Sequence, residues 1–221
     1  MPFTFLPVHA AGDGAWNWHL VAEALKTRGH EMVAVDLPAD DPSADLWTYA
    51  DSLVAAVDGR DDVVVVGHSF GAFTAPLVCA RRVVRSLILV SAMVPRPGER
   101  PADWWRNTGQ TDLERPDDGD DIAVYYHDVS PELAAEAIRR SRNHPSERAY
   151  EQRWPLDAWP DVATRVLICG DDRLFPATWM RGLVRDRLGI DAGDEIPSGH
   201  CPMLSVPDEL ADRLVAIATG G

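Results

Sequence analysis

The side chains best suited to covalent chemistry are a serine, a histidine and two aspartates that lie far apart in the sequence. Ser69 stands at the centre of GHSFG, a G-x-S-x-G pattern that directly follows the valine run 63–66. On a tight turn between a strand and a helix, such a serine exposes its hydroxyl beside the helix N-terminus. Gly67 and Gly71 relieve crowding there, so the pattern predicts a nucleophile. The alternative is a glycine turn with a helix-capping serine.

A serine hydroxyl reacts at neutral pH only when a base removes its proton and a further group orients that base. His200 lies in the loop sequence IPSGHCPML, and Asp171 and Asp172 follow an apolar run in VLICGDD. The chain order serine, aspartate, histidine is typical of hydrolases with a serine on such a turn. A solvated turn would also explain the aspartates, and these residues alone leave both open as the acid.

Attack by a serine also requires backbone N–H groups that stabilise negative charge on a substrate oxygen. Phe70, the residue after the serine, is one expected donor, and the loop in VHAAGDGAW after the first apolar run is expected to supply another. Small residues in this loop would let a substrate oxygen approach the backbone. The GDG sequence lacks the spacing of a nucleotide-binding loop, and an ordinary glycine turn is the alternative.

The cysteines indicate neither a disulfide framework nor a metal site, because Cys79, Cys169 and Cys201 are odd in number and widely spaced. Cys79 and Cys169 lie in apolar segments and are expected in the core. Cys201 follows His200 and is expected near the site, although no turn activates it as a nucleophile. We expect no metal and no organic cofactor.

The elements that must position these residues alternate between strands and helices. Strands are expected at 3–8, 32–35, 63–66, 87–90 and 166–169, with a sixth around Glu195 and Ile196. Helices are expected at 16–27, 46–57, 72–84 and 207–218, the last with a serine cap nearby. This alternation predicts an α/β fold with a mostly parallel sheet of about six strands and helices on both faces.

The alternation stops between about residues 96 and 160, a stretch rich in proline and tryptophan. Helices are expected at 103–108 and 131–142, no strand is expected, and the acidic run 112–121 is interpreted as a solvated loop. The position of this stretch between two strands predicts a helical cap inserted into a single domain spanning 1–221.

Aromatic residues of the cap are candidates for an apolar pocket with few charges, which would suit an uncharged ester. The pocket candidates are Trp104, Trp105, Tyr126, Trp154 and Trp159. The alternative is that these side chains pack the cap onto the sheet.

Size and charge restrict the class of protein. The 221 residues are 46% hydrophobic and 25% charged, which suits one globular domain, and the net charge of −14 argues against nucleic-acid and anionic-membrane partners. No stretch approaches the length of a membrane span, and the N-terminus lacks the features of a signal peptide, so a cytoplasmic location is expected. Nothing in the sequence indicates an oligomeric state, and a homodimer remains open.

Together these segments resemble the α/β-hydrolase superfamily, and within it the compact branch of plant methyl esterases, hydroxynitrile lyases and small bacterial esterases. The similar segments are PVHAAGDGAWNW, AVDLPA, VVVVGHSFGAF, LVSAMVP, CGDDRLFP and SGHCPML, which follow the family's order along nearly the whole chain. The cap is the part that resembles the family least.

The resemblance implies a catalytic triad in which Ser69 is the nucleophile and His200 is the general base. It favours Asp172 as the acid, because the family usually has D-x-x-x-P and a proline stands four residues after Asp172. It also implies that Ala11 is the second oxyanion donor. One departure is Ala10, at a position where the family commonly has glycine.

The expected activity is that of a serine hydrolase that cleaves a small, largely apolar carboxylic ester through an acyl-enzyme intermediate. A hydroxynitrile-lyase-like activity is one alternative. Such lyases tend to have a threonine after the strand-end histidine and a lysine before the catalytic histidine, whereas here Ala10 follows His9 and no lysine follows Lys26. A non-enzymatic ligand receptor is the other alternative, and the intact Ser-Asp-His order argues against it.

Overall fold

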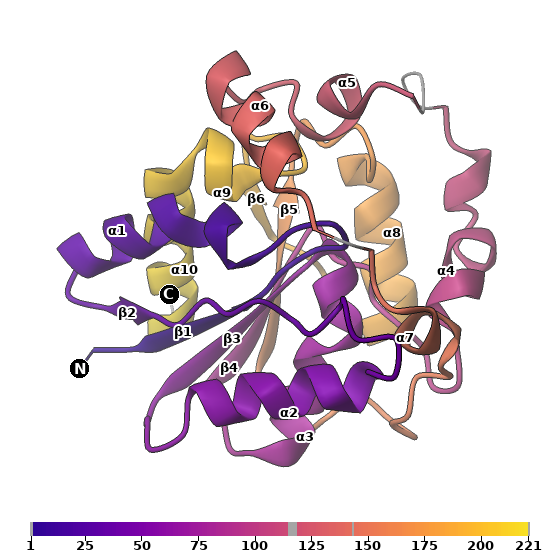
Figure 1. Cartoon of the computed structure of the whole chain (residues 1–221), viewed down its shortest axis with the longest axis horizontal. Helices are drawn as coiled ribbons and strands as arrows, with labels where there is room; N and C mark the ends of the chain where they lie inside the picture. Colours follow the sequence, from indigo (N-terminus) through magenta and orange to yellow (C-terminus); the bar gives the residue numbers. More distant parts are fainter. Residues whose placement is uncertain (1, 115–118, 143, 221) are drawn as a thin grey trace.

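A six-stranded parallel sheet forms the centre of the computed structural model, which describes residues 2–114, 119–142 and 144–220 (Figure 1). The strands are β1 (Thr4–Val8), β2 (Glu31–Met32), β3 (Val63–His68), β4 (Ser86–Val90), β5 (Thr164–Cys169) and β6 (Asp194–Ile196). They lie in the order β2-β1-β3-β4-β5-β6, and every neighbouring pair is parallel. The predicted α/β class and strand number are confirmed.

Helices cover both faces of the sheet (Figure 1). One face carries α1 (His19–Thr27), α9 (Pro202–Ser205) and α10 (Pro207–Thr219); the other carries α2 (Leu46–Ala56), α3 (Ala75–Arg81) and α8 (Ala177–Leu188). Successive side chains of a strand point to opposite faces, so Val63 and Val65 join the cluster beneath α2 while Val64 and Val66 join the cluster beneath α1. A continuous valine run therefore fits β3 because both of its faces are buried.

Several predicted boundaries shift. The expected strand 32–35 is only two residues long as β2, because the chain leaves the sheet edge after Val33 donates its N–H to the Phe5 carbonyl (2.9 Å). The first predicted helix begins as the 3-10 turn η1 (Ala15–Trp18), and the helix after Ser69 begins as η2 (Ser69–Phe73).

The expected serine cap of α10 is wrong. The N-cap residue is Val206, which makes no side-chain cap, and the Ser205 hydroxyl instead lies 2.9 Å from the Ser198 hydroxyl. Ser205 does not cap α10 because it is the last residue of α9, and its side chain points toward the loop before His200.

The order of the strands leaves a crevice at one point of the sheet. The chain runs outward from β1 to β2 and then returns to the other side of β1 with β3. The loops that follow β1 and β3 therefore diverge to opposite faces, which is where ligands bind in open parallel sheets. Ser69 and the loop 9–14 both lie at this point.

Residues 91–163 connect β4 to β5, and this segment is called the insertion below. It contains α4 (Pro101–Asn107), η3 (Gln110–Asp112), α5 (Asp121–Tyr125), α6 (Pro131–Arg140) and α7 (Glu147–Glu151), and its described residues form no strand. Four residues of the acidic run, 115–118, lie outside the described part of the chain. Figure 1 shows α5 and α6 together at one end of the insertion and α4 and α7 at the other.

Polar contacts hold the insertion to the rest of the domain. The Ser146 N–H donates to the Tyr49 hydroxyl (2.9 Å), and Arg142 pairs with Asp36 (2.9 Å) and Asp40 (3.2 Å). At its base, Glu99 forms an ion pair with Arg187 of α8, and the two side chains are only 5% and 1% exposed.

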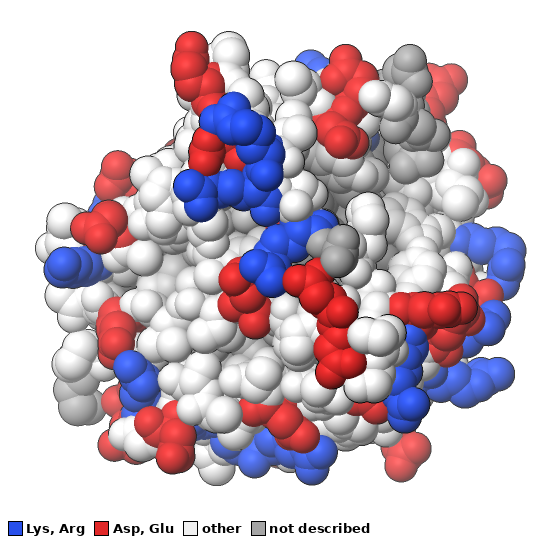
Figure 2. Space-filling model, viewed as in Figure 1, with Lys and Arg blue, Asp and Glu red and all other residues white. Residues whose placement is uncertain are grey.

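The surface carries mixed charge. On the face seen in Figure 2, arginine and lysine are interspersed with aspartate and glutamate rather than gathered into one basic patch. None of the helices in the described ranges is both long enough and apolar enough to cross a membrane.

Candidate active site

Ser69 occupies a strained turn at the carboxyl end of β3. Its φ is +49°, in the left-handed region that non-glycine residues rarely adopt. A Cβ on Gly71 would lie 2.1 Å from the Val8 carbonyl oxygen, and one on Gly67 would lie 2.9 Å from the Ala75 Cβ. The predicted crowding is confirmed, since both flanking positions lack room for a side chain.

His200 lies against a buried carboxylate. Its Nδ1 is 2.8 Å from Asp172 Oδ2, and both residues are buried. A carboxylate can only accept, so Nδ1 carries the hydrogen and Nε2 keeps a lone pair for a substrate-side proton. Asp171 is exposed, and its carbonyl, not its carboxylate, contacts the ring of His127. The structure therefore brings Asp172, rather than Asp171, to His200.

Asp172 is surrounded by donors. Oδ1 accepts the backbone N–H groups of Leu174 (2.8 Å) and Phe175 (3.0 Å), and Oδ2 also accepts the Ser91 hydroxyl (2.8 Å). Burial acts to raise the pKa of Asp172, but the charge of His200 and these hydrogen bonds outweigh it and lower the pKa. The carboxylate stays ionised near neutral pH. Sequence reasoning missed Ser91, although it lies in the family-like segment LVSAMVP.

Ser69 and His200 line one cavity of about 730 Å³, together with Ala11 and Phe70. Within the described part of the chain, no hydrogen bond joins the Ser69 hydroxyl to the His200 ring. Catalytic hydrogen bonds of this kind often tighten only when substrate is bound. The residues predicted as nucleophile, base and oxyanion donors thus meet in a single space.

The loop after β1 is held by His9, for which the sequence suggested no role. The Nδ1–H of His9 donates to the Ala10 carbonyl (2.9 Å), and Nε2 accepts the Leu37 N–H (3.1 Å). Burial lowers the pKa of His9, in keeping with this neutral ring. The left-handed residue of the loop is Gly12 (φ +81°), not Ala10, so alanine is accommodated where the family commonly has glycine.

Two of the predicted pocket residues, Trp105 and Tyr126, line the cavity. The prediction is wrong for Trp104, Trp154 and Trp159, which pack into or against the core. Their indole N–H groups find partners there: the Val94 carbonyl (2.9 Å), the Phe73 carbonyl (3.0 Å) and the Thr164 hydroxyl (3.0 Å), respectively. The alternative interpretation, packing of the insertion onto the sheet, holds for these three.

Comparison with known proteins bears on the family and the fold. The profile of the alpha/beta hydrolase family matches residues 8–213. The chain belongs to this family. Methylesterase 7 of Arabidopsis thaliana is 28% identical over 97% of this chain and 95% of its own length, and norfluorocurarine synthase 1 of Strychnos sp is 23% identical over 97% and 94%. A crystal structure of polyneuridine aldehyde esterase superposes with a TM-score of 0.82 at 22% identity, covering 99% of this chain and 100% of that one.

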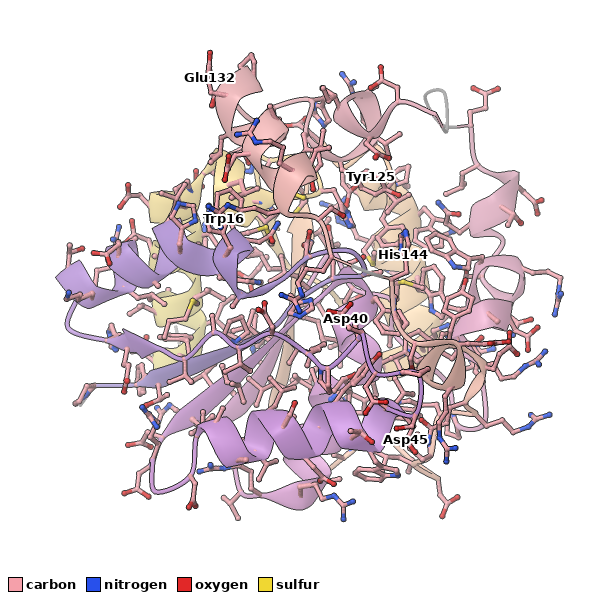
Figure 3. The ribbon with its side chains drawn as sticks, viewed as in Figure 1. Trp16, Asp40, Asp45, Tyr125, Glu132 and His144 are labelled. Carbon is pink, nitrogen blue, oxygen red and sulfur yellow. The ribbon has the colours of Figure 1, made fainter. Side chains whose placement is uncertain are left out.

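The cavity of this α/β hydrolase is also lined by residues outside the five predicted pocket candidates. Tyr125 and Tyr150 add aromatic surface, and His144 lies on the chain that leads into α7; Figure 3 labels Tyr125 and His144. Three carboxyl groups, those of Asp13, Asp121 and Glu147, also line the cavity. No local pattern distinguishes these acids from the many solvated ones in the chain.

Cys201 also lines the cavity of the hydrolase, as its place beside His200 suggested. It is buried, and burial raises the pKa of its thiol well above the ordinary value. The thiol stays protonated at neutral pH and is therefore a poor nucleophile.

Proposed function

We propose that this α/β hydrolase is a serine hydrolase that cleaves a small, largely apolar carboxylic ester through an acyl-enzyme intermediate. The observation that carries the proposal is the 2.8 Å hydrogen bond between His200 Nδ1 and Asp172 Oδ2, in the wall of a cavity that Ser69 also lines. The 28% identity to a methylesterase supports ester cleavage.

In the proposed reaction, His200 Nε2 takes the proton of the Ser69 hydroxyl as its oxygen attacks the ester carbonyl. The backbone N–H groups of Ala11 and Phe70 stabilise the oxyanion. His200 then gives the proton to the leaving alcohol and next activates a water that releases the acid. Asp172 stays ionised throughout and stabilises the imidazolium.

We further propose that the insertion acts as a lid and sets the choice of ester. Its aromatic residues Trp105, Tyr125, Tyr126 and Tyr150 line the cavity and offer apolar surface to an acyl or aryl group. A buried reaction centre also strengthens the electrostatic interactions that stabilise the oxyanion.

The proposal is tested by labelling with a fluorophosphonate, by peptide mapping of the label and by turnover of p-nitrophenyl butyrate. We expect the label on Ser69, and we expect Ser69→Ala to lose both labelling and turnover above background. Full turnover by this variant, or a label on Cys201, would refute the assignment. Cyanide release from mandelonitrile without ester cleavage would favour the lyase alternative.

The two adjacent aspartates provide a matched pair of variants. Asp172→Asn should lower kcat by roughly 10⁴-fold, as for the corresponding change in a serine protease, because His200 is then held in the wrong tautomer. Asp171→Asn should stay close to wild type because its exposed side chain does not contact His200. Equal losses in the two variants would contradict the assignment of Asp172.

A further inference from the structure

Asp13 is a buried carboxyl group in the cavity wall that the proposed reaction does not use. It lies in the loop after β1 and is 8% exposed. Its Oδ1 accepts a hydrogen bond from Asn17 Nδ2 (3.0 Å), whereas its Oδ2 is buried and has no hydrogen-bond partner among the described residues. A buried polar atom without a hydrogen-bond partner destabilises the folded protein. Asp13 Oδ2 therefore needs either a donor group beside it or a proton of its own.

A complementary group near this oxygen is His68, which lies at the end of β3 and is fully buried. Its Nε2 is 2.8 Å from the His200 carbonyl oxygen. A carbonyl can only accept, so Nε2 carries the hydrogen and Nδ1 has only a lone pair. This Nδ1 is the second buried atom without a partner, and it lies 3.9 Å from Asp13 Oδ2.

The protonation of the pair follows from this tautomer. Burial, together with the neighbouring His200, lowers the pKa of His68 to about 3, so the ring is neutral and the pair is no ion pair. If Asp13 were ionised, the lone pairs of its Oδ2 and of His68 Nδ1 would face and repel each other inside the protein. A protonated Asp13 would supply the one donor that both orphaned atoms lack. Burial also raises the pKa of Asp13 to about 7, an effect that the charge of His200 partly opposes.

We propose that Asp13 works as a neutral carboxylic acid whose O–H donates to His68 Nδ1, directly after a small rotation or through one water, and so positions His200. The chain of hydrogen bonds then runs from Asn17 through Asp13 and His68 to the backbone of His200. The His68 ring also packs against the His200 ring, with centroids 4.9 Å apart. Asp13 is thus a positioning residue that acts through His68.

Ionisation of Asp13 removes the donor, so the positioning is present below its pKa and is lost as the pH rises through it. Among the described residues, the titratable groups near Asp13 are His68, 3.9 Å away, and His200, Tyr126 and Cys201, which interact with it electrostatically. Burial raises the pKa of both Tyr126 and Cys201, and the charge of Asp13 adds to this, so neither ionises near neutral pH. Among these groups, Asp13 is the one whose pKa is shifted to near neutral pH.

The test compares Asp13→Asn with Asp13→Ala. The amide can donate to His68 and accept from Asn17, whereas alanine can do neither. The kinetic part rests on the proposed function, so kcat and KM are measured from pH 5 to 9 with p-nitrophenyl butyrate. The structural part does not, because ¹⁵N NMR of the wild type with labelled histidines reports the tautomer of His68 directly.

We expect His68 of the wild type as the Nε2–H tautomer with a hydrogen-bonded Nδ1. At pH 6 the Asn variant should keep kcat within about threefold of wild type, and the Ala variant should lose about tenfold or more, mainly in kcat, as for loss of one buried hydrogen bond. The wild type should lose activity on the alkaline side near pH 7, and the Asn variant should not.

Three results would overturn the proposal: an Nδ1–H tautomer of His68, equal losses in the Asn and Ala variants, or the same alkaline limb in wild type and Asp13→Asn. If Asp13→Ala does not fold, the tautomer of His68 in the wild type and the pH–rate profile of Asp13→Asn still test the proposal. Failure of the proposed function would look different. Ser69 would then take no fluorophosphonate label, whatever the tautomer of His68.

Discussion

The carboxylate of Asp172 shows how much of the site is built by residues outside the triad. It accepts hydrogen bonds from the backbone of Leu174 and Phe175, from the Ser91 hydroxyl and from the His200 ring. Two of these donors lie two and three residues after Asp172 in the chain, so a local turn supplies them. Ser91 comes from the end of a neighbouring strand, and only the packing of β4 against β5 brings it there.

Replacing Ser91 by alanine should lower kcat/KM by roughly ten- to a hundredfold, the size expected for one hydrogen bond to a charged group. The bond helps to lower the pKa of Asp172, so the folded protein is stabilised by the ionised carboxylate above the unfolded pKa and loses that stabilisation as the pH falls through the folded pKa. Ser91→Ala should move this loss to higher pH. Urea unfolding at pH 7 and at pH 4, together with pH–rate profiles, measures both effects.

Ser86, the first residue of β4, provides the matched control. It is also a buried serine, but its hydroxyl has no hydrogen-bond partner among the described residues. Ser86→Ala should therefore leave kcat/KM and its acid limb unchanged. A shift as large as that of Ser91→Ala would mean that the effect comes from general packing of β4.

At the scale of elements, the alternating pattern of apolar runs predicted the strands and their parallel sheet. The valine run of β3 was informative because both faces of this strand are buried. The glycines around Ser69 were informative because a side chain at Gly71 would have no space beside Val8. The direction of a side chain in the insertion is not local. Trp104 and Trp105 are neighbours in α4, yet only Trp105 lines the cavity, and this depends on how α4 packs against the sheet.

Gly71→Ala tests the turn between β3 and α3. The added Cβ would meet the Val8 carbonyl oxygen at 2.1 Å, so the backbone of β1 or η2 must move. We expect a loss of about 1–3 kcal/mol or more in the free energy of unfolding, as for other overpacked sites. Activity should fall as well, because the same shift displaces Ser69. Urea unfolding and turnover of p-nitrophenyl butyrate measure the two.

Gly182 in α8 is the control, since nothing lies within 4 Å of a Cβ at that position. Gly182→Ala should stabilise the protein by about 0.5–1 kcal/mol, because alanine favours a helix interior over glycine. A stabilising or neutral Gly71→Ala would show that the turn is looser than the contact with Val8 requires.

At the scale of the whole molecule, a buried ion pair joins the base of the insertion to α8. Glu99 pairs with Arg187, accepts a hydrogen bond from Asn107 (3.0 Å) and lies 5% exposed. Glu99→Gln should cost about 3–5 kcal/mol in the free energy of unfolding, because it leaves the buried guanidinium without its counter-charge. Urea unfolding at neutral pH measures the loss.

The control is the pair between Arg185 and Asp191, whose side chains are 70% and 83% exposed. Exposed pairs contribute little, so Asp191→Asn should leave stability close to that of the wild type. If Glu99→Gln were equally mild, water would have to reach Arg187, and the insertion would be held mainly by its apolar contacts.

At Ser69, the left-handed backbone conformation favours activity and lowers the stability of the folded protein. Holding such a conformation costs of order 1–3 kcal/mol, which the two cores on either side of the sheet must offset. Glycine would relax the bend but would leave nothing to attack a substrate. A firmer and inert protein is thus one substitution away, and only selection for turnover would keep the serine there.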